Sequence, residues 1–210
     1  KNSGSEIQEN AKVAYHLGDS HCLSFANRFI KIKNTKCLTR PLVTFGAKAF
    51  HFAQESPNRY KSITSINFRK IPPGSLALLS FGEMDCRYNE GIIIAARKNN
   101  KDIDKIIAET VCGYVEWFSD LNAEMGHDLY FFNVPAPKPF STLSPTENTH
   151  LAKTVSLFNL DLLRVTEKFG FKVIDLYQHT VNEKGFSNDL YHIDPHHLSP
   201  SILPKLSQYN

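Results

Sequence analysis

The 210-residue sequence has few cysteines and no long apolar run, and each shortage narrows the class of protein. The four cysteines, at positions 22, 37, 86 and 112, form no CxxC pair and no dense framework, so reduced thiols in a cytoplasmic protein are expected. No apolar stretch approaches the length of a transmembrane helix, so no membrane span is expected. The net charge is only +3 without a lysine or arginine cluster, so nucleic acid is not an expected partner.

The start of the chain lacks a signal-peptide core: its first ten residues are polar and begin with Lys1. We expect a loose polar leader over residues 1–11 and one domain over residues 12–210. A start at lysine suits a piece cut from a larger multidomain chain. With 41% hydrophobic residues, a chain of this length can bury one sizeable core.

Short apolar runs predict five strands, and segments with helical spacing lie between them. The expected strands cover residues 12–17, 41–45, 75–81, 128–134 and 171–176. The expected helices cover 22–30, 47–54, a segment that starts at Ser56-Pro57, 102–125, 144–169 and a short helix from Ser199-Pro200. Residues 88–100 fit either a helix or extended chain. This alternation implies an α/β fold, a three-layer α/β/α sandwich around a five-stranded parallel sheet of flavodoxin-like type.

Two of these helices carry specific sequence signals. Ser144 and Glu147 match a capping box, with Pro145 in the first turn of the helix. The helix after Ser56-Pro57 is expected to carry Tyr60, Ile63 and either Ile66 or Asn67 on one face.

Unusual polar motifs follow the expected strands, where parallel sheets bind their ligands. Gly18-Asp19-Ser20 follows the first strand, Gly46 the second, and residues 82–87 the third. A serine between strand and helix can expose its hydroxyl beside helical N–H groups that stabilise an oxyanion, and Gly18 would permit the sharp backbone reversal. The alternative is that Asp19 or Ser20 only caps the helix. The coincidence of polar motifs at the strand ends favours a nucleophile.

A serine nucleophile needs a base, and the base needs a group that orients it. Asp194 and His197 are three residues apart, so one helical turn would place both side chains on one side. Asp189 and His192 repeat this spacing and stay a second candidate pair.

These blocks resemble the SGNH, or GDSL-type, hydrolase family, whose pattern is Gly-Asp-Ser, a glycine after strand two, Gly-x-Asn-Asp and a late Asp-x-x-His. The matching blocks span residues 12–203: Gly18-Asp19-Ser20, Gly46, Gly82-Glu83-Met84-Asp85 and Asp194-Pro195-His196-His197. The resemblance implies an ester hydrolase or acyltransferase that needs no cofactor. In it Ser20 is the nucleophile, His197 the base and Asp194 its orienting carboxylate, and the N–H groups of Ser20 and Gly46 form the oxyanion hole.

The Gly-Asp-Ser-His and Gly-Glu-x-Asp-Cys-Arg variants resemble SGNH-like domains found beside polysaccharide-building enzymes. This likeness implies a small-molecule or glycan ester as the substrate, most specifically an acylated sugar. The residues expected to line the site are Asp19, His21, Glu83, Met84, Asp85, Arg87, His192 and His196.

One residue departs from the family pattern: Met84 stands where the family has an oxyanion-hole asparagine, and a thioether cannot donate a hydrogen bond. Losing one such donor typically costs ~10²–10³-fold in rate. Glu83 and Arg87, four residues apart, either pair with each other or leave Arg87 free to replace the missing donor.

Two rival functions follow from other features of the sequence. The dense set His192, Asp194, His196 and His197 could bind a metal ion, although no other His/Asp cluster supplies the remaining ligands. Met84 alternatively favours a degenerate domain that binds a glycan or a partner without catalysis.

Cys22 is expected to be a buried thiol behind Ser20 rather than a nucleophile. His16 and His21 either line the site or are satisfied residues at a strand end.

Overall fold

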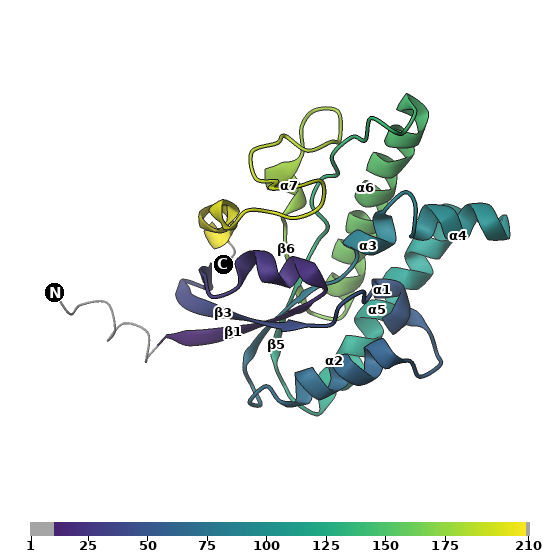
Figure 1. Ribbon diagram of the computed structural model, residues 1–210. Coiled ribbons are helices and arrows are strands. Elements are labelled where there is room, and N and C mark those ends of the chain that lie inside the picture. Colours follow the sequence, from purple (N-terminus) through teal and green to yellow (C-terminus); the bar gives the residue numbers. More distant parts are fainter. Residues whose placement is uncertain (1–10, 209–210) are drawn as a thin grey trace.

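The computed structural model describes residues 11–208, which form a six-stranded sheet with helices on one face and shorter segments on the other (Figure 1). The strand order is β2-β3-β1-β4-β5-β6. The strands are β1 (Lys12–Gly18), β2 (Phe29–Ile32), β3 (Thr35–Val43), β4 (Leu76–Ser80), β5 (Asp128–Phe132) and β6 (Lys172–Ile174). All neighbours pair in parallel except β2, which runs antiparallel to β3 at one edge. The α/β class with a five-stranded parallel core is confirmed, and the antiparallel sixth strand is an addition. The expected leader lies outside the described residues, apart from Ala11.

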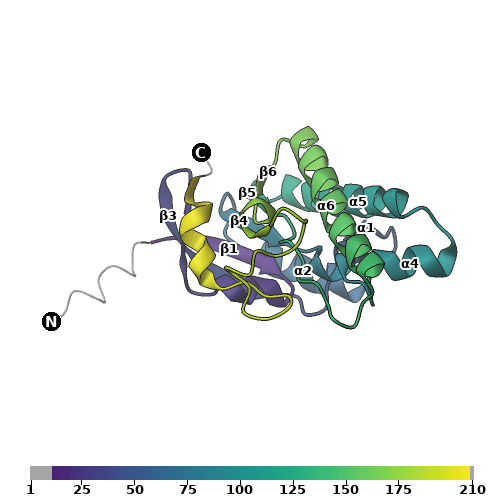
Figure 2. The same cartoon turned by 90° about the horizontal axis from the view of Figure 1, so that it is seen from above.

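The two faces of the sheet are covered very differently. The α-helices are α1 (Ala49–Ala53), α2 (Arg59–Arg69), α3 (Glu83–Cys86), α4 (Ile92–Asn99), α5 (Ile103–Ala123), α6 (Pro145–Lys168) and α7 (Tyr177–Thr180). Side chains from α1, α2, α5 and α6 pack on one face around Phe118, Phe131 and Phe158. The opposite face is closed by two 3-10 helices, η1 (Ser20–Phe25) and η2 (Pro200–Gln208). The second, which is the yellow helix in Figure 2, packs against β2.

Local sequence signals explain the two longest helices. The Ser144 hydroxyl accepts the Glu147 N–H while the Glu147 carboxylate accepts the Ser144 N–H, which is the expected capping box. Asp102 caps α5, and its apolar stripe is buried at every turn. Residues 92–99 of the ambiguous segment are helical, as α4. Among the described residues, no helix is both long and apolar enough to cross a membrane.

The helix expected over residues 22–30 is wrong. Only the short 3-10 helix η1 follows β1, and the chain then enters the β2–β3 hairpin. Lys33 and Asn34 both have positive φ, 45° and 62°, as the two central residues of a tight hairpin turn require. Ile30 and Ile32 are buried while Lys31 is exposed, so this segment has the period of a strand.

The face of α2 that carries Ile63 and Ile66 does not pack on the sheet. Ile63 and Ile66 are 45% and 56% exposed, whereas Thr64 and Phe68 are buried. The Phe68 ring packs edge-on against His127 with centroids 4.8 Å apart, and so it fixes which side of the helix faces the sheet.

Candidate active site

Ser20 begins η1 directly after β1 ends at Gly18, and Asp19 caps this turn by accepting the His21 N–H at 2.9 Å. The reason for a glycine at position 18 differs from the expected one. Its backbone is outside the left-handed region, but a Cβ there would lie 2.3 Å from the Ser80 hydroxyl oxygen and 2.9 Å from the Cys22 Cβ. Glycine is therefore needed for close packing of β1 against β4 and η1.

A continuous hydrogen-bonded chain joins three of the predicted residues. The Ser20 Oγ lies 2.9 Å from His197 Nε2, and His197 Nδ1 lies 2.8 Å from Asp194 Oδ2. Asp194 Oδ1 also accepts the backbone N–H groups of His196 and His197, each at 2.7 Å. Partial burial raises the pKa of Asp194, but these bonds outweigh it and hold that pKa below its ordinary value. The Asp194 carboxylate is thus fixed as an anion that orients the His197 ring.

The second candidate pair is not assembled at Ser20. His192 Nδ1 bonds the Ser187 hydroxyl at 2.8 Å, and Asp189 instead pairs with Lys138 at 2.7 Å. Burial lowers the pKa of His192 to about 4. The geometry therefore favours Asp194 and His197.

Gly46 lies in the turn after β3, beside the end of β1. Thr44 in this turn donates its N–H to the Gly18 carbonyl at 2.8 Å, which holds the turn against β1. Gly46 has φ +73°, a left-handed conformation that side chains disfavour. Within residues 11–208, no hydrogen bond uses the backbone N–H of Ser20 or of Gly46. Both donors are therefore free for a ligand.

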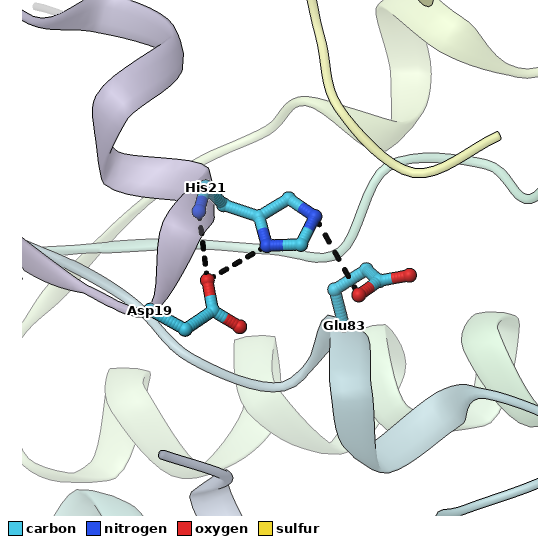
Figure 3. Close-up of side chains that lie close together, drawn as sticks. All are labelled: Asp19, His21 and Glu83. Carbon is cyan, nitrogen blue, oxygen red and sulfur yellow. Dashed lines mark hydrogen bonds and ion pairs between the residues drawn. The ribbon is translucent and has the colours of Figure 1, made fainter. Parts of the chain in front are cut away.

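Beside the triad, the His21 ring lies between two carboxylates (Figure 3). Asp19 Oδ1 is 2.7 Å from His21 Nδ1, and Glu83 Oε2 is 3.5 Å from His21 Nε2. Glu83 also bonds His196 Nδ1 at 2.7 Å and Arg87 at 2.8 Å. Burial raises the pKa of Glu83, but the bonds from His196 and Arg87 and the charge on His21 outweigh it and lower that pKa to about 2.

Arg87 pairs with Glu83, which is the first of the two alternatives that the sequence allows. Its Nε and Nη2 donate to Glu83, and its Nη1 donates to Glu90 at 2.7 Å. With these donors engaged, Arg87 does not take the place of the missing asparagine. Met84 lies half-buried in α3, next to Glu83.

Asp85 was expected to line the site, but its role in the structure is to hold two segments together. It is buried, and its two carboxylate oxygens accept the N–H groups of Ala49 and Phe50, at 2.7 and 2.9 Å. Burial raises the pKa of Asp85 to about 7. The residue ties the N-terminus of α1, just after Gly46, to α3.

Burial determines the chemical state of two further side chains near Ser20, His16 and Cys22. His16 is buried against Phe25 and Phe132, and its Nε2 bonds the Ser80 hydroxyl at 2.9 Å. Burial lowers the pKa of His16 to about 3. Cys22 is buried, and this raises the pKa of its thiol to about 12, so a thiolate nucleophile is excluded at neutral pH.

Two cavities adjoin this network. The larger, of about 170 Å³, has an apolar floor that includes Val134, Leu151 and Val155, and a polar rim that includes Glu83 and His196. The smaller, of about 30 Å³, is lined mainly by apolar side chains, with His16 and His21 on its wall. The larger cavity has room for one ring-sized group next to His196, the residue before His197.

The metal set expected from the sequence is divided among separate partners: His192 bonds Ser187, His196 bonds Glu83, and His197 and Asp194 bond each other. A different trio, Asp19, His21 and Glu83, offers ligand atoms within 4.8 Å of one another. In this trio the two carboxylates flank opposite ring nitrogens of His21 (Figure 3), and the 2.7 Å Asp19–Nδ1 distance is that of a direct hydrogen bond. This geometry fits an imidazole ring held between two carboxylates better than a metal ion bound by all three side chains.

Comparison with known proteins gives a fold. No family model and no curated protein matches the sequence, whereas 57 chains of solved structures match the structure. An extracellular lipase from Streptomyces rimosus is 10% identical, with TM-score 0.58 over 93% of this chain and 96% of that chain. A GDSL-like lipase from Bacteroides thetaiotaomicron is 15% identical, with TM-score 0.56 over 90% and 80%. A carbohydrate acetylesterase from Sinorhizobium meliloti is 13% identical, with TM-score 0.53 over 93% and 94%.

These three matches cover 90–93% of this chain and 80–96% of the neighbours. The chain therefore has the fold of the SGNH, or GDSL-type, hydrolases, as its sequence motifs predict. At 10–15% identity this likeness concerns the fold, so the activity is argued from the site itself.

Proposed function

We propose that the protein is a serine-dependent ester hydrolase or O-acyltransferase that acts through a covalent acyl-enzyme. The observation that carries the proposal is the unbroken chain from Ser20 through His197 to Asp194, with bonds of 2.9 and 2.8 Å. Nucleophile, base and orienting carboxylate in this order are what acyl transfer requires. The solved lipases and esterases of the same fold agree with this chemistry.

The proposed reaction has two halves. Ser20 Oγ attacks the ester carbonyl as His197 Nε2 takes its proton, and the N–H groups of Ser20 and Gly46 stabilise the oxyanion. The tetrahedral intermediate collapses, His197 returns the proton to the alcohol oxygen that leaves, and the acyl group stays on Ser20. Water or a sugar hydroxyl then attacks the acyl-enzyme by the same steps in reverse, which releases the acid or an acylated acceptor.

We propose an acylated carbohydrate as the substrate. The cavity of about 170 Å³ supports this because its floor is apolar while Glu83, Asn89, Glu90 and His196 supply polar groups at its rim. One face of a sugar ring is apolar and its edge carries hydroxyls, so both parts of the lining would be used. The solved carbohydrate acetylesterase of the same fold supports the same class.

The test of the activity is labelling with a fluorophosphonate, followed by peptide mass spectrometry. Folded protein is expected to carry the adduct on Ser20, and Ser20→Ala is expected to remove both the adduct and the turnover of p-nitrophenyl acetate. Ser24→Ala, in the same 3-10 helix, is the matched control and should keep both. An unlabelled Ser20 in folded protein contradicts catalysis and favours a binding domain, for which Met84 is the supporting residue.

The substrate class is tested separately. Acetyl esters of glucose or xylose should be turned over with a higher kcat/KM than p-nitrophenyl acetate. Val155→Trp, which fills the cavity floor, should remove that preference while p-nitrophenyl acetate turnover stays within about twofold. Equal values of kcat/KM for sugar and simple esters would contradict a carbohydrate substrate.

A further inference from the structure

The surroundings of His21 dictate its protonation state. Nδ1 lies 2.7 Å from the Asp19 carboxylate, and Nε2 lies 3.2 Å from the His196 carbonyl and 3.5 Å from the Glu83 carboxylate. All three partners can only accept hydrogen bonds, and a neutral imidazole carries only one N–H. Both ring nitrogens are satisfied only when both carry hydrogen, which makes His21 an imidazolium.

The electrostatic environment supports this state. Burial lowers the pKa of His21, but the bond to Asp19 and the charges of Asp19 and Glu83 outweigh it and raise that pKa, with Arg87 opposing. The side chain is 11% exposed, and those of Asp19 and Glu83 are 1% and 14% exposed. A charge in such a site is only weakly screened by solvent and salt.

This cation lies directly on the proposed base. The rings of His21 and His197 are stacked, with centroids 4.6 Å apart and planes inclined by 24°. His197 also bonds Ser20 through Nε2 and Asp194 through Nδ1. Protonation of His197 therefore has to occur beside an existing positive charge, which Asp194 offsets from the other end of the ring.

We propose that His21 is a positioning residue: Asp19 and Glu83 hold it as an imidazolium, and its fixed positive charge, stacked on the His197 ring, keeps ester turnover active at mildly acidic pH. The proposal rests on the proposed function for its kinetic consequence, but not for the protonation state of His21. Once His197 has taken the proton, the two stacked cations repel each other, which favours delivery of that proton to the oxygen of the leaving alcohol. The proton passes from Ser20 to His197 and then to the alcohol, and His21 keeps its own throughout.

The direct test is ¹⁵N NMR of histidine-labelled wild-type protein. The ring of His21 should show two protonated nitrogens from pH 5 to pH 8. A wild-type His21 with one bare nitrogen at pH 7 would overturn the proposal, and this reading needs neither a folded variant nor enzyme turnover.

The kinetic test compares pH profiles of kcat/KM. In His21→Gln the acid limb should move upward by roughly one pH unit while the plateau at pH 8–9 changes less than about tenfold. His21→Arg, which keeps a positive charge, should move the limb back toward wild type. His150→Gln is the matched control, because His150 is exposed on α6. An unmoved acid limb in folded His21→Gln contradicts the proposal, whereas absent Ser20 labelling with a doubly protonated His21 contradicts only the proposed function.

Discussion

Ser20 and His197 are 177 positions apart in the chain, yet one 2.9 Å hydrogen bond joins their side chains. The motifs predicted this meeting from local spacing alone, because Asp-x-x-His and a strand-end serine are each readable over a few residues. What decided between the two Asp-x-x-His pairs was non-local: Ser187 and Lys138 bind His192 and Asp189. These two partners could not be predicted from the spacing of the residues.

The environment of His197 leads to a first prediction. His197→Ala should lower kcat for ester turnover by several orders of magnitude, because the base of a coupled triad is removed. His192→Ala, in which the lost bond is to Ser187 rather than to Ser20, should cost less than about tenfold. Steady-state kinetics on p-nitrophenyl acetate measures both. A stronger loss in His192→Ala would transfer the role of base to His192.

Met84 leads to the second prediction. If position 84 points toward the oxyanion as in the family pattern, Met84→Asn should raise kcat by roughly two orders of magnitude, because a correctly aimed donor is worth ~3 kcal/mol in the transition state. Met125→Asn is a matched control, since Met125 is the only other methionine and follows α5, near Gly74. An unchanged kcat in Met84→Asn would show that the oxyanion is bound without any group at position 84.

At the scale of elements, segments with strong local signals were predictable. The capping box of α6 and the apolar stripe of α5 fixed both helices from sequence. The β2–β3 hairpin was missed because Lys33 and Asn34 adopt positive φ without a glycine to announce the turn. Ile63 and Ile66 are exposed, which the apolar pattern of α2 alone does not predict. The buried side of α2 is instead set by a tertiary contact, that of the Phe68 ring with Phe118 of α5.

The contact between α3 and α1 leads to the third prediction. Asp85→Ala leaves the N–H groups of Ala49 and Phe50 without their acceptors, so it should lower the free energy of unfolding by about 2–4 kcal/mol. Because α1 follows the Gly46 turn, activity should fall as well. Urea denaturation followed by circular dichroism measures the first effect. Asp104→Ala, at an exposed position of α5, should change stability by less than about 0.5 kcal/mol.

At the scale of the whole molecule, pH dependence of stability follows from buried ionisable groups. His16 has a pKa of about 3 in the folded protein and 6.5 when unfolded. The unfolded chain therefore binds the extra proton below pH 6.5, and the stability contributed by neutral His16 is complete above that pH and lost as the pH falls toward 3. Asp85, with its folded pKa raised to about 7, acts in the opposite direction between pH 7 and 4.

A substitution isolates the His16 contribution and gives the fourth prediction. Between pH 6.5 and 5 the wild type should lose about 2 kcal/mol through His16, and His16→Gln should lack this loss. Asp85 is common to both proteins, so its effect cancels in the difference. Urea titrations at the two pH values measure it, with His150→Gln as an exposed control that keeps the wild-type dependence. Parallel pH dependences in wild type and His16→Gln would contradict a neutral buried His16.

The closing of the second sheet face by η2 has a consequence for synthesis on the ribosome. Asp194 and His197 lie in the loop directly before η2, and Ile202, Leu203 and Leu206 of η2 pack against the sheet face beneath it. Translation delivers Ser20 well before this segment. A nascent chain in which residues 194–208 have yet to leave the exit tunnel thus carries its serine hydroxyl without a proton acceptor. Reactivity toward esters would begin only when this segment docks, so acylation of Ser20 before that point of elongation is avoided by chain order alone.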